Sequence, residues 1–251
     1  MLKYTFLMIF KSIYLLLNLV KNGMKIIYFL VLLVSISLSA QTDFEKGEKL
    51  FNQKRFVEAK PFFENYLKMN PNNYKTIELL GDVAGQQKNW NEAIKHYKIL
   101  KEQFPKEANY WYKYGGALGM KAKEANKFKA LGMLDEVEGS FLKAAKLDVK
   151  HIETRWALVI YYIQIPGILG GSEKKSQKYA NELMVISPVD GYLSNGYIAE
   201  YFKRYAEAEK FYIKANEIGK SAKTYQKLYD LYVNKLKNTE KAKKLKEQFE
   251  K

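Results

Sequence analysis

Few residues of this chain have the types and spacings that do chemistry. The most prominent group is the glycine-rich stretch PGILGGS, from Pro166 to Ser172. Backbone amides of such a stretch, placed before a helix, can hold a phosphate. Neither nucleotide-binding pattern fits: Glu173 stands where the hydrolase loop needs lysine, and Gly170-Gly171 lack the alternating glycine spacing of the dinucleotide fingerprint. We therefore predict a turn, in which Pro166 ends one helix and Ser172 caps the next. An enzyme or an anion- or nucleotide-binding protein that uses the Pro166–Ser172 loop is the alternative interpretation.

The titratable residues do not form a recognisable catalytic set. Glu78 and Asp82 share one helical face, as residues four apart do, and paired carboxylates can perform acid–base chemistry. On a repeat helix, solvated charges are the expected alternative. His96 falls inside a helix and His151 follows a helix end, where surface or capping roles are expected. The chain has no cysteine, which excludes disulfides and thiolate zinc sites. We predict no catalytic residue, no cofactor and no metal site.

The elements that position these residues repeat with a period of 34 residues. Gly47, Gly81 and Gly115 follow one another at that spacing. Apolar residues recur at helical spacing on both sides of a short polar turn, so each unit is expected to be two antiparallel helices. Small residues let the two helices approach, an aromatic ring fills the space between one unit and the next, and a proline ends the second helix. The same period relates Ala59 to Ala93, Phe63 to Tyr97 and Pro71 to Pro105.

These positions resemble the tetratricopeptide repeat family from about Phe44 to the C-terminus, most closely over residues 41–118. The third unit is lengthened, and Val149 stands where its terminating proline is expected. Together with the Pro166–Ser172 turn, this looks like a subgroup of exported bacterial proteins with a Pro-Gly-x-x-Gly-Gly-Ser turn between helices. The resemblance implies an all-α fold, a right-handed superhelical solenoid of about six helix-turn-helix units over residues 41–251.

Residues 1–40 differ from the rest and contain four lysines and no acidic residue. Residues 24–40 have the layout of a secretory signal: a lysine, an apolar run from Ile26 to Val34, and small residues that predict cleavage after Ala40. Residues 1–23 form a second apolar stretch. Met24 could be the true start, or residues 1–40 could remain as a membrane anchor, and only then is a membrane a partner. The pattern predicts an exported protein, periplasmic or associated with the cell envelope.

The net charge of +15 does not by itself indicate a nucleic-acid partner. The chain has 42 basic residues, but Arg55, Arg155 and Arg204 are its only arginines, and the lysines are scattered among acidic residues. Lysine lacks the planar fork with which arginine recognises phosphate and guanine. We expect a solvated surface and no nucleic-acid partner.

The resemblance implies a non-catalytic scaffold that binds a protein or peptide. In this family the first helix of each unit lines a concave face that holds an extended peptide or a partner helix. Tyrosines suit such a surface because they combine a large apolar body with a polar tip, but the same tyrosines could pack between units. The register places these residues in the groove: Lys75, Glu78, Asp82, Tyr112, Tyr161, Gln164, Tyr197 and Tyr201.

Overall fold

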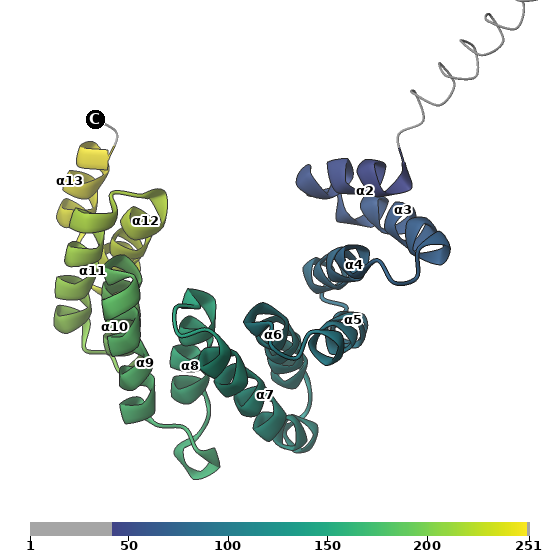
Figure 1. The fold of residues 1–251 in the computed structure, drawn as a ribbon. Helices are drawn as coiled ribbons and strands as arrows, with labels where there is room; N and C mark the ends of the chain where they lie inside the picture. Colours follow the sequence, from purple (N-terminus) through teal and green to yellow (C-terminus); the bar gives the residue numbers. More distant parts are fainter. Residues whose placement is uncertain (1–41, 250–251) are drawn as a thin grey trace, which may run out of the picture. The chain divides into compact units, whose positions relative to one another are not determined.

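The computed structural model describes residues 42–249, which form helices and no strand (Figure 1). These residues divide into two compact units, 42–69 and 70–249. The first unit holds α2 (Asp43–Asn52) and α3 (Phe56–Met69). The second unit holds α4 (Tyr74–Gln86), α5 (Trp90–Gln103), α6 (Ala108–Glu124), α7 (Lys127–Leu147), α8 (Ile152–Gln164), α9 (Glu173–Ile186), α10 (Pro188–Tyr201), α11 (Tyr205–Gly219), α12 (Ala222–Asp230) and α13 (Thr239–Phe249). A short 3-10 helix, η1 (Gly167–Leu169), precedes α9, and a π-helical turn, η2 (Leu231–Lys235), follows α12.

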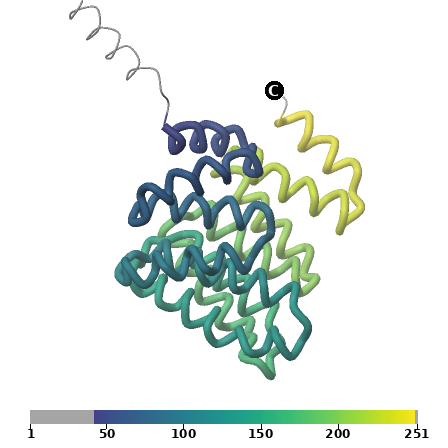
Figure 2. The backbone as a smooth tube through the Cα atoms, turned by 90° about the vertical axis from the view of Figure 1, so that its right-hand side faces the viewer, coloured from purple at the N-terminus to yellow at the C-terminus, as the bar shows by residue number. Residues whose placement is uncertain are grey.

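Consecutive helices pack as pairs, and the described residues contain six of them, from α2 with α3 to α12 with α13. In the second unit, α4, α6, α8, α10 and α12 open their pairs, and we call them the first helices. Their partners α5, α7, α9, α11 and α13 are the second helices. The hairpins of this unit follow one another side by side (Figure 2). The predicted signal sequence, residues 24–40, lies outside the described residues.

In three pairs of the second unit, α4–α5, α6–α7 and α10–α11, an aromatic ring of the second helix packs on a glycine of the first. A Cβ atom on Gly81 would stand 2.6 Å from a ring carbon of Tyr97, and one on Gly196 would stand 2.3 Å from Tyr212. Tyr212 is fully buried, so its ring has no room to retreat. The sequence predicted a ring between units. The ring in fact lies first against the glycine of its own pair, which makes glycine a steric requirement at these positions.

In four of the six described pairs, the turn between the two helices is made by a lysine with a left-handed backbone. Lys88, between α4 and α5, has φ 58°, and Lys203, between α10 and α11, has φ 60°. The next amide then reaches back to the first helix: Asn89 N–H donates to the Ala84 carbonyl at 2.8 Å. This hydrogen bond satisfies an unpaired carbonyl at the helix end. At the left-handed position that Lys88 occupies, glycine is the common residue. Lys54 and Lys237 adopt the same conformation.

The extra residues of the third unit extend its helices. α6 has 17 residues and α7 has 21, against 13 and 14 in α4 and α5. α7 ends without the expected proline, because Val149 replaces it. Arg155 of α8 is 3% exposed, and its guanidinium donates to the carbonyls of Ala145 at 3.1 Å and Asp148 at 2.6 Å. A buried guanidinium thus satisfies the helix end that would otherwise lack partners.

No helix between residues 42 and 249 is long and apolar enough to cross a lipid bilayer.

Replacing Gly81 with alanine tests the ring-on-glycine contact. Alanine gains about 1 kcal/mol of helix propensity, but overpacking a buried ring costs about 1–3 kcal/mol. Because a new Cβ would stand 2.6 Å from Tyr97, we expect Gly81→Ala to lower the free energy of unfolding by about 1 kcal/mol. Gly132→Ala in α7 is the matched control, since no neighbouring atom lies within 4 Å of the place its Cβ would take, and it should stabilise the protein. Urea unfolding measures both, and equal stabilisation by both substitutions would contradict the packing argument.

Candidate functional site

A lysine of one pair binds two carboxylates of the preceding pair on the first helices. Lys113 Nζ of α6 lies 2.6 Å from Glu78 Oε1 and 2.7 Å from Asp82 Oδ1, both on α4. The Tyr97 hydroxyl donates to the same Asp82 oxygen at 2.6 Å. Lys75 Nζ stands 3.6 Å from Glu78 and stays exposed. Glu78 and Asp82 are therefore not a free acid–base pair: they join two neighbouring first helices through one cation.

Burial and charge set the protonation of this cluster. Burial alone would raise the pKa of Glu78, but the hydrogen bond and charge of Lys113, with help from Lys75, outweigh it and lower that pKa. For Tyr97, burial and the neighbouring Asp82 both favour the neutral phenol and raise its pKa far above the ordinary value. The lowered pKa keeps Glu78 ionised at neutral pH, and the raised pKa keeps Tyr97 a neutral hydrogen-bond donor.

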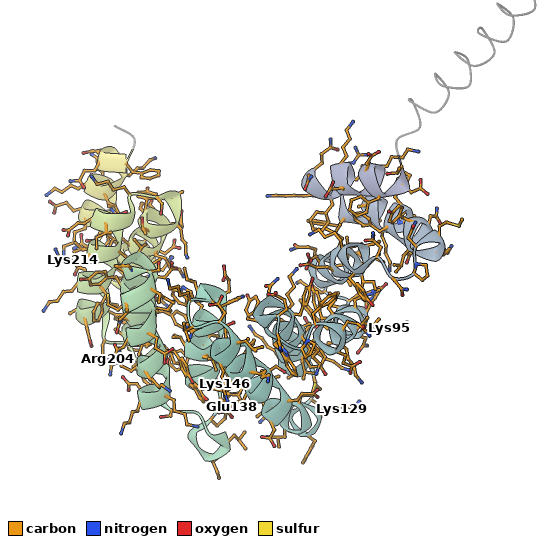
Figure 3. All side chains as sticks on the ribbon, viewed as in Figure 1. Lys95, Lys129, Glu138, Lys146, Arg204 and Lys214 are labelled. Atoms are coloured by element: carbon orange, nitrogen blue, oxygen red, sulfur yellow. The ribbon has the colours of Figure 1, made fainter. Side chains whose placement is uncertain are left out.

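The same arrangement of tyrosine, carboxylate and lysine occurs again further along the chain. Tyr212 of α11 donates to Glu200 of α10 at 2.9 Å, and Lys235 of η2 stands 4.0 Å from that carboxylate. In both cases the tyrosine is the one that lies on a glycine. Two related triads involve α7, on which Glu138 is labelled in Figure 3. These are Tyr114 with Glu136 and Lys101, and Tyr162 with Glu138 and Lys175.

A second cluster joins three consecutive first helices through Asp190 of α10. Trp156 of α8 donates its indole N–H to Asp190 Oδ1 at 2.9 Å, and Lys223 of α12 donates to the same oxygen at 3.1 Å. Ser187 donates to Oδ2 at 2.6 Å. Burial alone would raise the pKa of Asp190, but the three hydrogen bonds and the charge of Lys223 outweigh it and lower that pKa. The carboxylate is thus ionised and shared between α8, α10 and α12.

The predicted groove residues fall into different environments. Gln164 is exposed and donates to the Tyr197 hydroxyl at 3.3 Å, and the Tyr197 ring lies 6.5 Å from the Trp156 ring. Tyr201, 47% exposed, stacks edge-on with its neighbour Phe202. The structure therefore brings Gln164 and Tyr197 together beside the Asp190 cluster, as it brings Lys75, Glu78 and Asp82 together around Lys113.

Two of the predicted tyrosines pack between helices. Tyr161 is only 8% exposed, and its hydroxyl donates to the Leu134 carbonyl of α7 at 3.2 Å. Burial raises its pKa to about 12, with smaller contributions from two acidic neighbours. The half-buried Tyr112 ring lies 5.3 Å from the His151 ring. For Tyr161 the structure adopts the alternative of packing between units.

Sequence reasoning missed the residues that hold these clusters together, namely Lys113, Trp156, Asp190 and Lys223. A signal was present in the spacing, because Trp156 and Asp190 are 34 residues apart and Lys223 follows 33 residues later. The first spacing equals the repeat period and the second is one residue shorter, so the three residues take similar places on successive first helices. Polar residues recurring at the repeat period could have been sought in the same way as the glycines.

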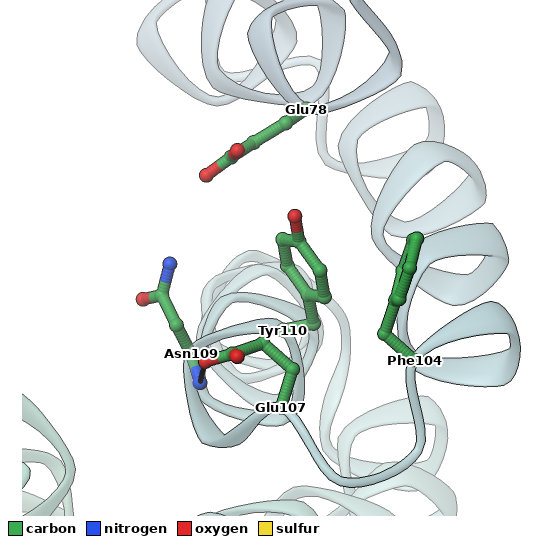
Figure 4. Close-up of a pocket in the computed structure, with 5 residues that line it drawn as sticks. All are labelled: Glu78, Phe104, Glu107, Asn109 and Tyr110. Atoms are coloured by element: carbon green, nitrogen blue, oxygen red, sulfur yellow. Dashed lines mark hydrogen bonds between the residues drawn. The ribbon is translucent and has the colours of Figure 1, made fainter. Parts of the chain in front are cut away.

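A small cavity of about 200 Å³ adjoins the first cluster (Figure 4). It is lined by Glu78, Phe104, Glu107, Asn109 and Tyr110. Figure 4 shows the Glu78 carboxylate and the Tyr110 hydroxyl facing each other across it. Burial, followed by the charge of Glu78, raises the pKa of Tyr110. Two of its lining residues, Glu78 and Glu107, contribute carboxylates.

Three backbone amides of the Pro166–Ser172 stretch donate hydrogen bonds to carbonyls of the same chain. The N–H groups of Leu169 and Gly171 both donate to the Pro166 carbonyl, at 2.8 and 3.2 Å, and Ser172 N–H donates to Tyr162 O at 2.8 Å. Gly170 has φ 94°. The Ser172 hydroxyl accepts from Lys175 N–H at the start of α9, as the sequence predicted for a cap. These hydrogen bonds describe a turn, and they leave the three amides unavailable to a phosphate.

The histidines take structural positions. The His151 ring accepts from Thr154 N–H at 3.2 Å and so caps α8, while His96 of α5 lies 3.9 Å from Glu92. Between residues 42 and 249 there is no group of three or more His, Cys, Asp or Glu residues that could hold a metal ion.

Comparison with known proteins shows which family part of the chain resembles. The sequence model of the tetratricopeptide repeat family matches residues 50–115. Residues 50–115 are thus similar to tetratricopeptide repeats. A search of curated proteins found no match.

Several solved structures, among them tetratricopeptide repeat proteins, share the fold. A thermophilic repeat protein from Thermus thermophilus is similar with a TM-score of 0.63 at 17% identity, over 76% of this chain and 97% of that one. A repeat protein from Parabacteroides merdae gives 0.56 at 17% identity, over 82% and 77%. The human IFIT1 dimer with PPP-AAAA gives 0.64 at 18% identity, over 78% of this chain and 47% of that chain. The predicted class, an all-α superhelical repeat, is confirmed. Tetratricopeptide repeats generally mediate protein–protein interactions.

The lowered pKa of Asp190 predicts a loss of stability in acid. A carboxylate whose pKa is lower in the folded state stabilises the protein above the unfolded-state pKa, about 4, and this contribution disappears as the pH falls through the folded-state pKa. We expect Asp190→Asn to show a smaller drop in the free energy of unfolding between about pH 6 and pH 3 than the unchanged chain. Exposed Asp135→Asn is the control and should behave as the unchanged chain does. Urea titrations at the two pH values decide, and an undiminished drop in Asp190→Asn would contradict the assignment.

Proposed function

We propose that this protein is a non-catalytic interaction scaffold of the cell envelope, which binds a peptide or protein segment along its first helices. The observation that supports the proposal is that side chains of successive first helices bond to one another. Lys113 binds Asp82, and Asp190 accepts from both Trp156 and Lys223. A surface fastened in this way loses little conformational freedom on binding, so more of the contact energy becomes affinity.

The chemistry of the first helices suits an extended polypeptide. Gln164 and Tyr201 remain exposed, and amide and phenol groups can pair with a partner's backbone and side chains. The small cavity beside Glu78 and Tyr110 offers a place for one basic or donating side chain. Fixed charges of both signs, from Lys75 to Asp190, favour a partner of matching pattern and speed its encounter.

The proposed location rests on the sequence of residues 1–40. Export to the periplasm or outer envelope follows from the lysine, the apolar run and the small residues before Gln41. A mature chain would begin at Gln41, one residue before the Thr42 side chain that caps α2. We propose that the chain belongs to the exported bacterial subgroup with the Pro-Gly-x-x-Gly-Gly-Ser turn.

Site-specific photo-crosslinking tests the binding face. We expect a photoreactive residue in place of Tyr201 on α10 to capture a discrete protein when the full chain is expressed in its own cells. The same residue in place of Ile218, which is similarly exposed on the second helix α11, should not capture that protein. Gln164→Ala should weaken the capture at position 201. Identical products from both positions would contradict binding along the first helices.

Export and cleavage are tested by the mass of the envelope-associated protein. We expect its N-terminus at Gln41, because the small residues end at Ala40. A product that begins at Met1 or Met24 and partitions with the membrane would contradict cleavage and support an anchor.

A further inference from the structure

A larger groove lies away from the first-helix clusters, between the C-terminal ends of the second helices α7 and α9. Its volume is about 510 Å³, within the range of about 300–1,000 Å³ typical of ligand sites. Apolar side chains form much of its lining and remain exposed to solvent: Val149 is 68% exposed, Val185 83% and Leu142 38%. Large apolar groups gathered in one exposed groove commonly mark an interaction site.

The floor of the groove is fixed by Arg155. Its buried guanidinium holds the end of α7 through the carbonyls of Ala145 and Asp148, and its Nε lies 3.3 Å from Glu182 of α9. One side chain of α8 therefore contacts both walls, α7 and α9. Val149 occupies the position where the repeat pattern expects a proline, and its side chain is part of the groove. The residue that replaces the expected proline thus forms part of the groove's apolar lining.

The charges of the groove are unequal. Lys146 and Lys178 are exposed beside the apolar residues, and Lys146 is labelled on α7 in Figure 3. The lining contains a single carboxylate, Glu182, which already lies 3.3 Å from Arg155 and 4.0 Å from Lys178. Lys146 forms no ion pair within residues 42–249. The groove therefore combines apolar walls with excess positive charge.

We infer that this groove binds an acidic peptide segment of a partner protein, anchored by apolar side chains. Two or three aliphatic groups of the peptide cover Val149, Val185 and Leu142, and a carboxylate lies near Lys146 and Lys178. The hollow shape favours a polypeptide over a membrane, because a flat bilayer cannot fill a depression. The site is separate from the first-helix clusters, so one chain can hold two segments at once.

Defined peptides test the chemistry of the groove. The probe is a fluorescein-labelled dodecapeptide of leucines and glutamates, with one control in which lysine replaces every glutamate and another in which serine replaces every leucine. With the full chain, fluorescence anisotropy should show at least about tenfold tighter binding of the probe than of either control. Equal affinities for the three peptides would overturn the proposal.

Matched variants tie the binding to this groove. Lys146→Glu should weaken binding of the probe about tenfold, whereas Lys95→Glu, an equal change of charge at an exposed residue of α5, should leave it within about twofold. Both substitutions are on the surface, and unchanged thermal melting confirms folding. If both variants weaken binding equally, the attraction is diffuse and the groove is not the site.

A cysteine handle reports where the peptide lies. Because the chain contains no cysteine, Val185→Cys provides a unique attachment point for a benzophenone crosslinker. We expect a crosslink to the probe peptide there and none from Ile218→Cys on α11. A crosslink between two copies of the chain at Val185→Cys, without one to the peptide, would overturn the proposal in favour of self-association.

Discussion

The structure depends on aromatic rings of the second helices α5, α7 and α11, each of which packs on the backbone of a glycine in the first helix of its pair. The contact between Gly81 and Tyr97, repeated at Gly196 and Tyr212, sets the separation of the two helices, since a Cβ atom at either glycine would stand within 2.6 Å of the ring. The ring also reaches past the glycine. Its hydroxyl donates to a carboxylate of the first helix, which in turn binds a lysine of the next pair. Packing inside one pair is thereby coupled to the charges that join it to its neighbour, and a change in the core is expected to alter the surface of the first helices.

The surface of the first helices and the groove between α7 and α9 have different chemistry. On the first helices, the charged side chains pair mainly with each other, as Lys113 does with Asp82, so the surface is ordered and its net charge is locally balanced. Between α7 and α9, the third pair is lengthened and the terminating proline is absent, and the buried Arg155 satisfies the helix end in its place. The result there is an apolar depression with unbalanced lysines. The first surface suits a segment that matches a pattern of charges, and the second suits one with apolar anchors and acidic residues.

The sequence predicted the fold well because packing repeats with the chain. Gly81, Ala93 and Tyr97 are all buried, and the Pro166–Ser172 stretch is the predicted turn with a serine cap. It predicted the site less well because a repeat register gives the helix on which a residue lies but not where its side chain points. Tyr161 and Tyr197 occupy adjacent first helices, yet the first is buried against α7 and the second meets Gln164. In four of the six described pairs the turn carried no glycine signal, because lysine adopts the left-handed conformation there.

Hydrogen–deuterium exchange on Gly196→Ala tests most directly whether ring-on-glycine packing holds the stack together pair by pair. In a stack of repeats each pair contacts only its neighbours, so a local defect should remain local. The account predicts faster exchange in α10 and α11, extending to α12 and η2 through Glu200 and Lys235, while α4 and α5 exchange as in the unchanged chain. Unchanged exchange in α10 and α11, or an equal increase along the whole second unit, would contradict it.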